Sequence, residues 1–161
     1  MTFVEANAMV VGEQVGLVPN EDYGTPAIVD EENRRVYGFA QGIASTSEIK
    51  EYVKATGGAV LRPVGTEYGY GTGTKLNLAI DGVTVKSYDL IIFGDVDGDA
   101  VCDINDLPYI LSFTAGSTIC DDPVILFAGD LTNDGLIDVD DLSVFLLATN
   151  GSIVVDQTNP Y

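Results

Sequence analysis

The stretch GDVDGDAVCDIND, from Gly94 to Asp106, places five aspartates within twelve residues and contains neither lysine nor arginine. A second stretch, GDLTNDGLIDVDD from Gly129 to Asp141, also contains five aspartates and no basic residue. Like charges crowded on a short segment repel one another, and a folded chain does not gather them without compensation. What compensates them decides how the second half of the chain folds.

The two stretches belong to a longer repeat. Residues 94–116 and 129–151 align at a constant offset of 35, and 9 of the 23 aligned pairs are identical. The identities include aspartates at positions 1, 5, 9 and 12 of each loop, counted from Asp95 and from Asp130. A solvated acidic turn would not require the same four positions twice, so the pattern indicates an internal duplication with a chemical purpose.

This spacing matches calcium-binding loops, which place oxygen ligands at positions 1, 3, 5, 7, 9 and 12, with a backbone carbonyl at position 7. We expect two Ca²⁺ ions, because carboxylates on alternate residues of a curled loop converge on a hard divalent cation. The expected ligands of the first site are Asp95, Asp97, Asp99, the Val101 carbonyl, Asp103 and Asp106. Those of the second site are Asp130, Thr132, Asp134, the Leu136 carbonyl, Asp138 and Asp141.

Each loop departs from the usual pattern at one position in its first half. Thr132 replaces a carboxylate or amide at position 3 of the second loop, where its hydroxyl can ligate the ion or hold a water. Ala100 stands at position 6 of the first loop, where the sharp turn favours glycine and where the second loop has Gly135. A left-handed backbone at Ala100 would cost about 1–2 kcal/mol.

The flanking sequences argue against a calmodulin-like sensor. An EF-hand is a helix, a loop and a helix, but SYDLIIFG, which enters the first loop, has the pattern of a strand. Only an exiting helix is expected, over about 104–114, with Pro108 tolerated in its first turn. Position 12 is aspartate in both loops, where a sensor uses a bidentate glutamate.

Charge is distributed unequally along the chain. Residues 1–93 hold 12 acidic and all 7 basic residues, whereas residues 94–161 hold 13 aspartates and no basic residue, which places the expected domain boundary at Gly94. A net charge of −18 argues against nucleic acid or anionic membrane as a partner. No apolar run is long enough for membrane insertion, and the first residues, MTFVEANAMV, lack the basic region of a signal peptide.

Residues 1–93 predict a small α+β module in the order β-β-α-β-β-β, with one helix on one sheet. Strands are expected at 24–30, 34–40, 59–64, 74–80 and 83–93, the last two joined by a turn at Asp81-Gly82. Ser45 and Glu48 form a capping box that starts a helix over about 46–56. The stretch GYGTGTK, Gly69 to Lys75, precedes an alternating strand and not a helix, so we interpret its glycines as part of a bend or bulge and not of a phosphate loop.

The two repeats, GDVDGDAVCDINDLPYILSFTAG and GDLTNDGLIDVDDLSVFLLATNG, resemble the paired repeats of dockerin modules over about residues 94–151. The resemblance implies that residues 94–161 form a small all-α module with two EF-hand-like calcium loops and a C-terminal tail. Dockerins bind cohesin domains on scaffoldins, which brings their parent polypeptides into cellulosome-like or amylosome-like complexes. Residues 1–93, which end in YDLIIFGD, are similar to the X-type accessory modules that precede some dockerins. An extracellular protein, secreted or attached to the cell surface through the complex, is therefore expected.

The resemblance also implies where a cohesin would bind. Partner choice in dockerins lies largely at loop positions 10 and 11, which here are Ile104 and Asn105, and Val139 and Asp140, not the Ser-Thr pair of many type I dockerins. Helix faces beyond those needed for a core add a candidate interface, made of Tyr109, Ser112, Phe113, Val144, Leu147 and Ala148. Burial of these residues against the first module or the tail is the alternative. Because the two repeats differ here, we expect one dominant binding orientation.

Other interpretations stay open. One is a calcium sensor; another is an extracellular calcium-stabilised adhesin or carbohydrate-binding module, in which tyrosines stack on sugars: Tyr23, Tyr37, Tyr68 and Tyr70. No enzyme is expected, because the chain has no histidine and the clustered carboxylates are assigned to metal. Cys102 and Cys120 could form a disulfide or remain free thiols, which geometry decides.

Overall fold

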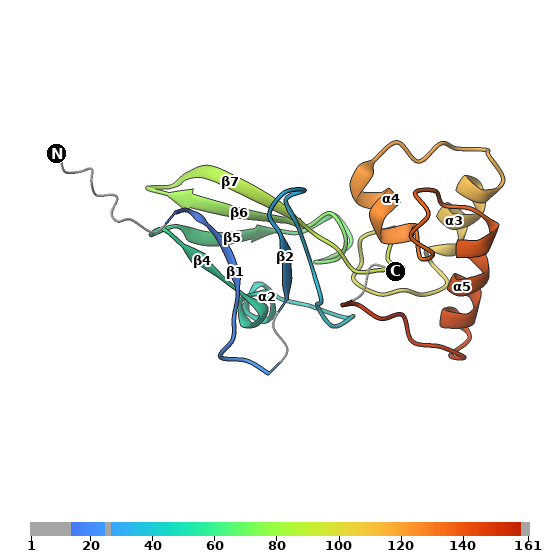
Figure 1. The fold of residues 1–161 in the computed structure, drawn as a ribbon, viewed down its shortest axis with the longest axis horizontal. Coiled ribbons are helices and arrows are strands. Elements are labelled where there is room, and N and C mark those ends of the chain that lie inside the picture. Colours follow the sequence, from blue (N-terminus) through green and yellow to red (C-terminus); the bar gives the residue numbers. More distant parts are fainter. Residues whose placement is uncertain (1–13, 25–26, 159–161) are drawn as a thin grey trace.

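The computed structural model describes residues 14–24 and 27–158, within which lie seven strands and four helices (Figure 1). The first ten residues, examined above for a signal peptide, lie outside the described residues. So do residues 25–26 of the strand expected at 24–30 and the last three residues of the tail.

The larger sheet has five strands in the order β2-β3-β7-β6-β5. Their bounds are β2 Ile28–Asp30, β3 Arg35–Tyr37, β5 Val60–Val64, β6 Lys75–Ile80 and β7 Val83–Leu90. The β6–β7 hairpin turns at Asp81 and Gly82, both with positive φ, which confirms the turn expected there. β3 pairs with β7 in parallel, whereas the other neighbouring pairs are antiparallel. Alternate side chains of β6 and β7, such as Leu76, Leu78 and Tyr88, are fully buried.

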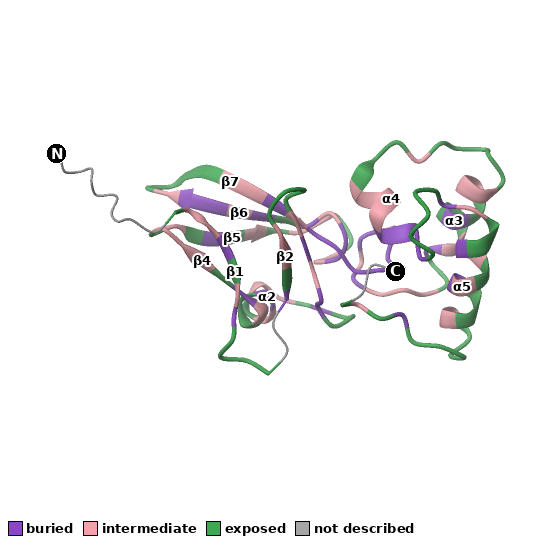
Figure 2. Cartoon of the chain, viewed as in Figure 1, coloured by how far each residue is buried: buried purple, intermediate pink, exposed green. Residues whose placement is uncertain are grey.

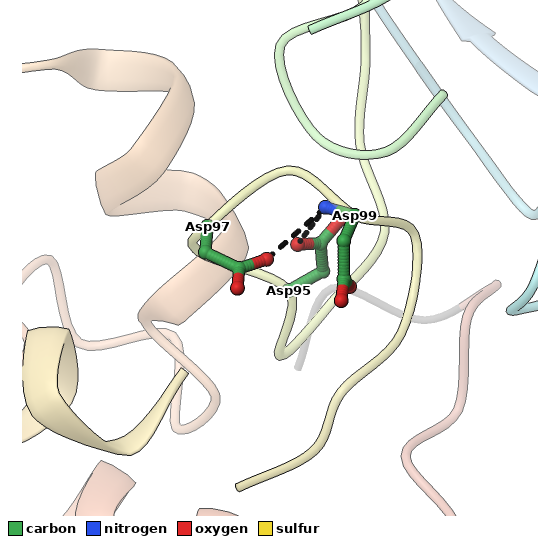
Figure 3. Close-up of side chains that lie close together, drawn as sticks. All are labelled: Asp95, Asp97 and Asp99. Carbon is green, nitrogen blue, oxygen red and sulfur yellow. Dashed lines mark hydrogen bonds between the residues drawn. The ribbon is translucent and has the colours of Figure 1, made fainter. Parts of the chain in front are cut away.

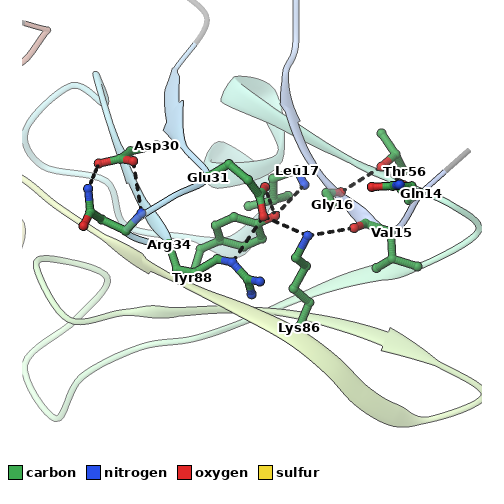
Figure 4. Close-up of polar contacts among 11 residues, drawn as sticks. Gln14, Val15, Gly16, Leu17, Asp30, Glu31, Arg34, Thr56, Lys86 and Tyr88 are labelled. Atoms are coloured by element: carbon green, nitrogen blue, oxygen red, sulfur yellow. Dashed lines mark hydrogen bonds and ion pairs between the residues drawn. The ribbon is translucent and has the colours of Figure 1, made fainter.

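A second sheet pairs β1 (Gly16–Pro19) with β4 (Val53–Thr56) in antiparallel register, next to helix α2 (Thr46–Tyr52). The expected cap is present, since Ser45 accepts a hydrogen bond from the Glu48 amide. The small sheet is tied to the large one through a polar network (Figure 4). In it the Tyr88 hydroxyl donates to Glu31 at 2.6 Å and accepts from the Leu17 amide.

Three helices follow the strands: α3 (Leu107–Thr114), α4 (Pro123–Gly129) and α5 (Val139–Thr149). Helix α4 lies in the segment between the repeats, where no helix was expected. It begins as many helices do, with proline in its first turn and the Asp122 carboxylate accepting from the Val124 amide. None of the described helices is long and apolar enough to cross a membrane.

The helices do not stand apart from the strands. Their core includes Ile91 and Phe93, which continue directly from β7, and Tyr37 of β3 packs against it. The rings of Tyr37, Phe93 and Phe127 lie within 5.2–5.8 Å of one another, centroid to centroid. The tail returns to the same place, because Gln157 both accepts from the Phe93 amide and donates to its carbonyl. Figure 2 shows buried residues running from the strands into the helical part.

The expected fold class is wrong. We expected one helix on a single sheet, followed by a small all-α dockerin module, but the chain is an α+β protein whose seven described strands form two sheets. The helix expected at 46–56 ends at Tyr52, because residues 53–56 pair with β1 as a strand. The helix expected from Ile104 begins at Leu107. Residues 53–56 form a strand because they pair with the distant strand β1, and a local sequence pattern carries no information about such long-range pairing.

Candidate metal centres

Asp95 opens the first loop and is fully buried. Its carboxylate accepts hydrogen bonds from the amides of Gly98 at 2.6 Å and Ala100 at 3.0 Å, which curl the loop around it. A further amide, from Thr72 in the bend before β6, donates to the same carboxylate at 2.8 Å. Asp95 therefore organises the loop and also joins it to the sheet.

Asp106 closes the first loop and is equally buried. It accepts from the amides of Val96 at 2.7 Å, Asp97 at 3.0 Å and Asp103 at 2.9 Å. Asp106 is thus drawn to the start of the loop, to residues ten and nine positions earlier, and α3 begins immediately after it. The residue that closes the loop is therefore also the residue that precedes the first turn of α3.

The second loop repeats this pattern. The Asp130 carboxylate accepts from the amides of Asp134 and Gly135, at 3.1 and 2.7 Å, as Asp95 does from the residues 35 positions earlier. Asp141 accepts from the amides of Thr132 and Asp138, both at 2.8 Å, as Asp106 does from Asp97 and Asp103. The amides of Val101 and Leu136 donate to Asp99 and Asp134, and those of Asn105 and Asp140 donate to Asp103 and Asp138. Six hydrogen bonds therefore recur at the same offset as the sequence repeat.

Two clusters of carboxylates result. In the first, Asp95, Asp97 and Asp99 each bring a carboxylate oxygen to within 4.8 Å of the others. Figure 3 shows these three side chains close together on the loop. The second cluster consists of Asp130, Asp134 and Asp141. Asp103 and Asp106 of the first loop and Asp138 of the second do not belong to these clusters, and the Thr132 hydroxyl donates to Asp141.

Burial raises the pKa of these carboxyl groups. The pKa of Asp95 rises to about 6 and that of Asp106 to about 7, mainly because burial disfavours the charged form and in spite of the amides that donate to them. Burial also raises the pKa of Asp97 and of Asp141. None of the ion pairs among the described residues includes an aspartate of either loop. The negative charge therefore has no basic side chain paired with it.

The donor set fits a hard divalent cation. Each cluster offers carboxylate oxygen atoms without sulfur or imidazole, which suits calcium or magnesium and not zinc or copper. An acidic cluster by itself does not single out calcium. Ala100 has a φ of +81°, so the left-handed backbone anticipated at position 6 is present, as it is at Gly135 with a φ of +93°.

The residues expected to contact a partner divide into two groups. Exposed ones are Ile104, Asn105, Tyr109, Val139, Asp140 and Leu147. Ser112, Phe113, Val144 and Ala148 are half-buried, and all of these except Ser112 pack against the helical core. Leu111 and Leu146 were not among the residues expected at the interface, yet both are exposed, at equivalent positions of the two repeats. The identity of these two leucines at an offset of 35 was the feature of the sequence that could have identified them as equivalent positions.

The two cysteines are free thiols in the structure. Burial, followed by the nearby carboxylate of Asp106, raises the pKa of Cys102 to about 12. Its thiol therefore stays protonated and packs as a small apolar group against the helical core.

Comparisons of the chain with protein-family models, with curated proteins and with solved structures found no match. The functional argument rests on the residues and their geometry.

Proposed function

We propose that the chain is a calcium-dependent protein docking module. It binds a cohesin domain on a scaffoldin or cell-surface protein, and so incorporates its parent polypeptide into an extracellular cellulosome-like complex. It has no catalytic activity of its own. The observation that carries the proposal is the recurrence of six loop hydrogen bonds at an offset of 35 around two carboxylate clusters that lack basic partners.

Calcium acts structurally in this proposal. Each ion neutralises carboxylates that otherwise repel one another and so stabilises the loop from which a helix begins. The first ion would be held by the aspartates clustered in residues 95–106 and the second by those in residues 130–141. The free energy of ion binding then contributes to the free energy of folding, and the docking surface forms only in the calcium-bound protein.

The docking surface lies on the exposed sides of the loop ends and of α3 and α5. Equivalent positions in the two repeats present apolar side chains to solvent, Ile104 with Val139 and Leu111 with Leu146. Leu147 of α5 is exposed as well, whereas the equivalent residue of α3 is Ser112. Exposed apolar side chains grouped in this way favour a protein partner.

The test is a pull-down with scaffoldin fragments that carry cohesin domains, in calcium and in excess chelator. Capture in calcium that is lost in chelator and restored by added calcium supports the proposal. A variant with Asp95→Ala and Asp130→Ala should fail in calcium too. Capture that is equally strong in chelator contradicts a calcium-dependent role.

A calcium-stabilised carbohydrate-binding module is the second candidate. Tyr68 and Tyr109 are exposed and line a hollow of about 540 Å³ together with Asp97 and Asp99. Aromatic faces beside a calcium loop could bind a sugar ring. Glycan-array binding that Tyr68→Ala abolishes, without any cohesin capture, would favour this candidate. Of the other tyrosines considered above, Tyr37 and Tyr70 pack against the cores.

A further inference from the structure

The first acidic loop is held from outside by the bend that precedes β6. Besides the Thr72 amide on Asp95, the Thr66 hydroxyl donates to the Gly98 carbonyl at 2.7 Å, and the Gly71 amide donates to the same carbonyl at 3.2 Å. These donors come from residues 65–74, here named the glycine-rich bend. The bend therefore contacts both the first ligand of the loop and the turn behind it.

A second segment of the sheet part contacts the loop two and four residues further on. The Gly42 amide donates to the Ala100 carbonyl at 2.8 Å, and the Gln41 side chain accepts from the Cys102 amide at 2.8 Å. Contacts therefore reach the backbone at residues 98, 100 and 102 in succession. They surround Ala100, whose left-handed backbone persists only where its surroundings enforce it.

Gly71 is where the bend approaches most closely. A Cβ atom added there would overlap with the Asp95 carboxylate, the Ala100 amide nitrogen and the backbone of Gly98. Only glycine permits this approach, so the glycine-rich bend and the first loop fit each other as packed surfaces.

The second loop has no equivalent support. Apart from the backbone bonds inside α5, the hydrogen bonds that residues 130–141 form with other described residues remain within residues 126–143. Residues 132–136 are exposed, whereas residues 97–101 are buried or half-buried. Two loops with the same internal bonds thus differ in what surrounds them.

We propose that the glycine-rich bend is a positioning element for the first ion site, and that the two sites are unequal because only one has it. This inference rests on the proposed calcium function. The bend holds the first loop in its ion-binding shape before the ion arrives, so less ordering is required on binding. The first site then fills at lower calcium than the second, and its formation is coupled to the folded sheet.

The test follows the amide NMR signals of Gly98 and Gly135, each of which donates to the first aspartate of its own loop. Calcium is titrated into the full chain after chelation. In the unmodified protein, we expect the Gly98 signal to reach its midpoint at a calcium concentration at least about tenfold lower than the Gly135 signal does. A difference of this size corresponds to one charge-assisted hydrogen bond that only the first site has. Gly71→Ala should move the Gly98 midpoint upward by about tenfold or more and leave Gly135 within about twofold.

Gly24→Ala is the matched control, because a Cβ atom there meets none of the described residues within 4 Å. Thr66→Val removes the hydroxyl that donates to the Gly98 carbonyl and accepts from the Tyr68 and Gly69 amides, without inserting volume against the loop. Thr66→Ser should restore the unmodified behaviour. Equal midpoints in the unmodified chain, or equal shifts of both signals in Gly71→Ala and in Thr66→Val, overturn the inference.

A failure of the calcium proposal gives a different result. If neither glycine signal responds to millimolar calcium, the proposed function fails. Hydrogen exchange in chelated protein then tests the bend alone. Exchange of the Ala100 amide should be faster by about tenfold in Thr66→Val than in the unmodified chain, while the Gly135 amide is unchanged. Equal exchange in the two proteins overturns the positioning role.

Discussion

The Arg35 guanidinium carbon lies 3.6 Å from the centroid of the Phe127 ring. This contact joins β3 of the large sheet to α4, the helix between the two acidic loops. Arg35 also pairs with Asp30 at 3.1 Å, so its planar group is held from two sides. Because Phe127 contacts Tyr37 and Phe93 as well, the strands and helices share one aromatic junction.

Replacing Phe127 with alanine should destabilise the whole chain. The variant loses an aromatic cluster and a cation–π contact, so we expect the free energy of unfolding to fall by about 2–4 kcal/mol. Denaturant unfolding followed by circular dichroism measures it. Tyr23→Ala, which alters an exposed tyrosine, should change the value by less than about 0.5 kcal/mol. Equal effects of the two substitutions would contradict the importance of the junction.

Chelation should remove helix from the second half of the chain. Without ions, ten aspartates in residues 95–106 and 130–141 repel one another, which weakens the closure of the loops that precede α3 and α5, and most in the second loop, which the glycine-rich bend does not support. Circular dichroism at 222 nm should weaken in excess chelator and recover when calcium is restored. An unchanged spectrum in excess chelator would show that calcium does not support these helices.

The dependence of stability on pH should reverse with calcium. The pKa values of Asp95 and Asp106, about 6 and about 7, lie above those of the same groups in an unfolded chain. The folded ion-free protein therefore keeps protons on these groups at pH values where the unfolded chain has released them. Stability present at acidic pH is therefore lost as the pH rises through about 7. Calcium requires the deprotonated groups, so its affinity rises over the same range. Denaturation midpoints at pH 5 and pH 7.5 should fall with pH in chelator and rise with pH in calcium; parallel trends would contradict this.

Ala100→Gly should stabilise the chain by up to about 1 kcal/mol, since glycine relieves the left-handed strain at some cost in unfolded-state entropy. Denaturant unfolding in saturating calcium measures the gain. Ala148→Gly lies inside α5, where glycine should instead destabilise by about 1 kcal/mol. A loss of stability in Ala100→Gly similar to that in Ala148→Gly would show that the backbone at position 6 carries no strain.

One binding orientation should dominate in the proposed cohesin complex. Leu147→Asp places a charge in the exposed apolar surface of α5 and should weaken binding by about 30-fold or more. Ser112→Asp, at the equivalent position of α3, should cost less than about threefold. Affinities come from calorimetry with a cohesin that the pull-down captures, and circular dichroism verifies the fold. Equal losses would indicate that both repeats bind equally.

Several local features could be predicted from the sequence because short-range chemistry determines them. Positive φ at Asp81 and Gly82 follows from the turn that Asp-Gly forms between alternating strands. The Ser45 cap follows from its spacing to Glu48, and the left-handed Ala100 from its place in the loop. The aspartates at loop positions 1 and 12 accept the amides that close each loop. In these cases the partners are separated by at most eleven residues, so spacing alone brings them together.

Other features depend on contacts between distant segments. Residues 53–56 continue a helical pattern, yet they pair with β1, more than thirty residues earlier. Helix α4 begins at Pro123 and has little periodicity of its own, but its aromatic residue, Phe127, packs against Tyr37 of β3 and against Phe93, which follows β7. Neither contact can be recognised from a short stretch of sequence. For this reason the sequence analysis predicted neither strand β4 nor helix α4.

The sequence by itself determined two acidic loops, their repeat at an offset of 35 and the oxygen chemistry that each offers to an ion. Only the tertiary structure decided that the loops are unequal. The glycine-rich bend looks like an ordinary turn in the sequence, but the fold brings Gly71 and Thr72 against Asp95. The physical reason is that hydrogen-bond spacing within a loop is local, whereas burial and external support depend on which distant segment packs beside it.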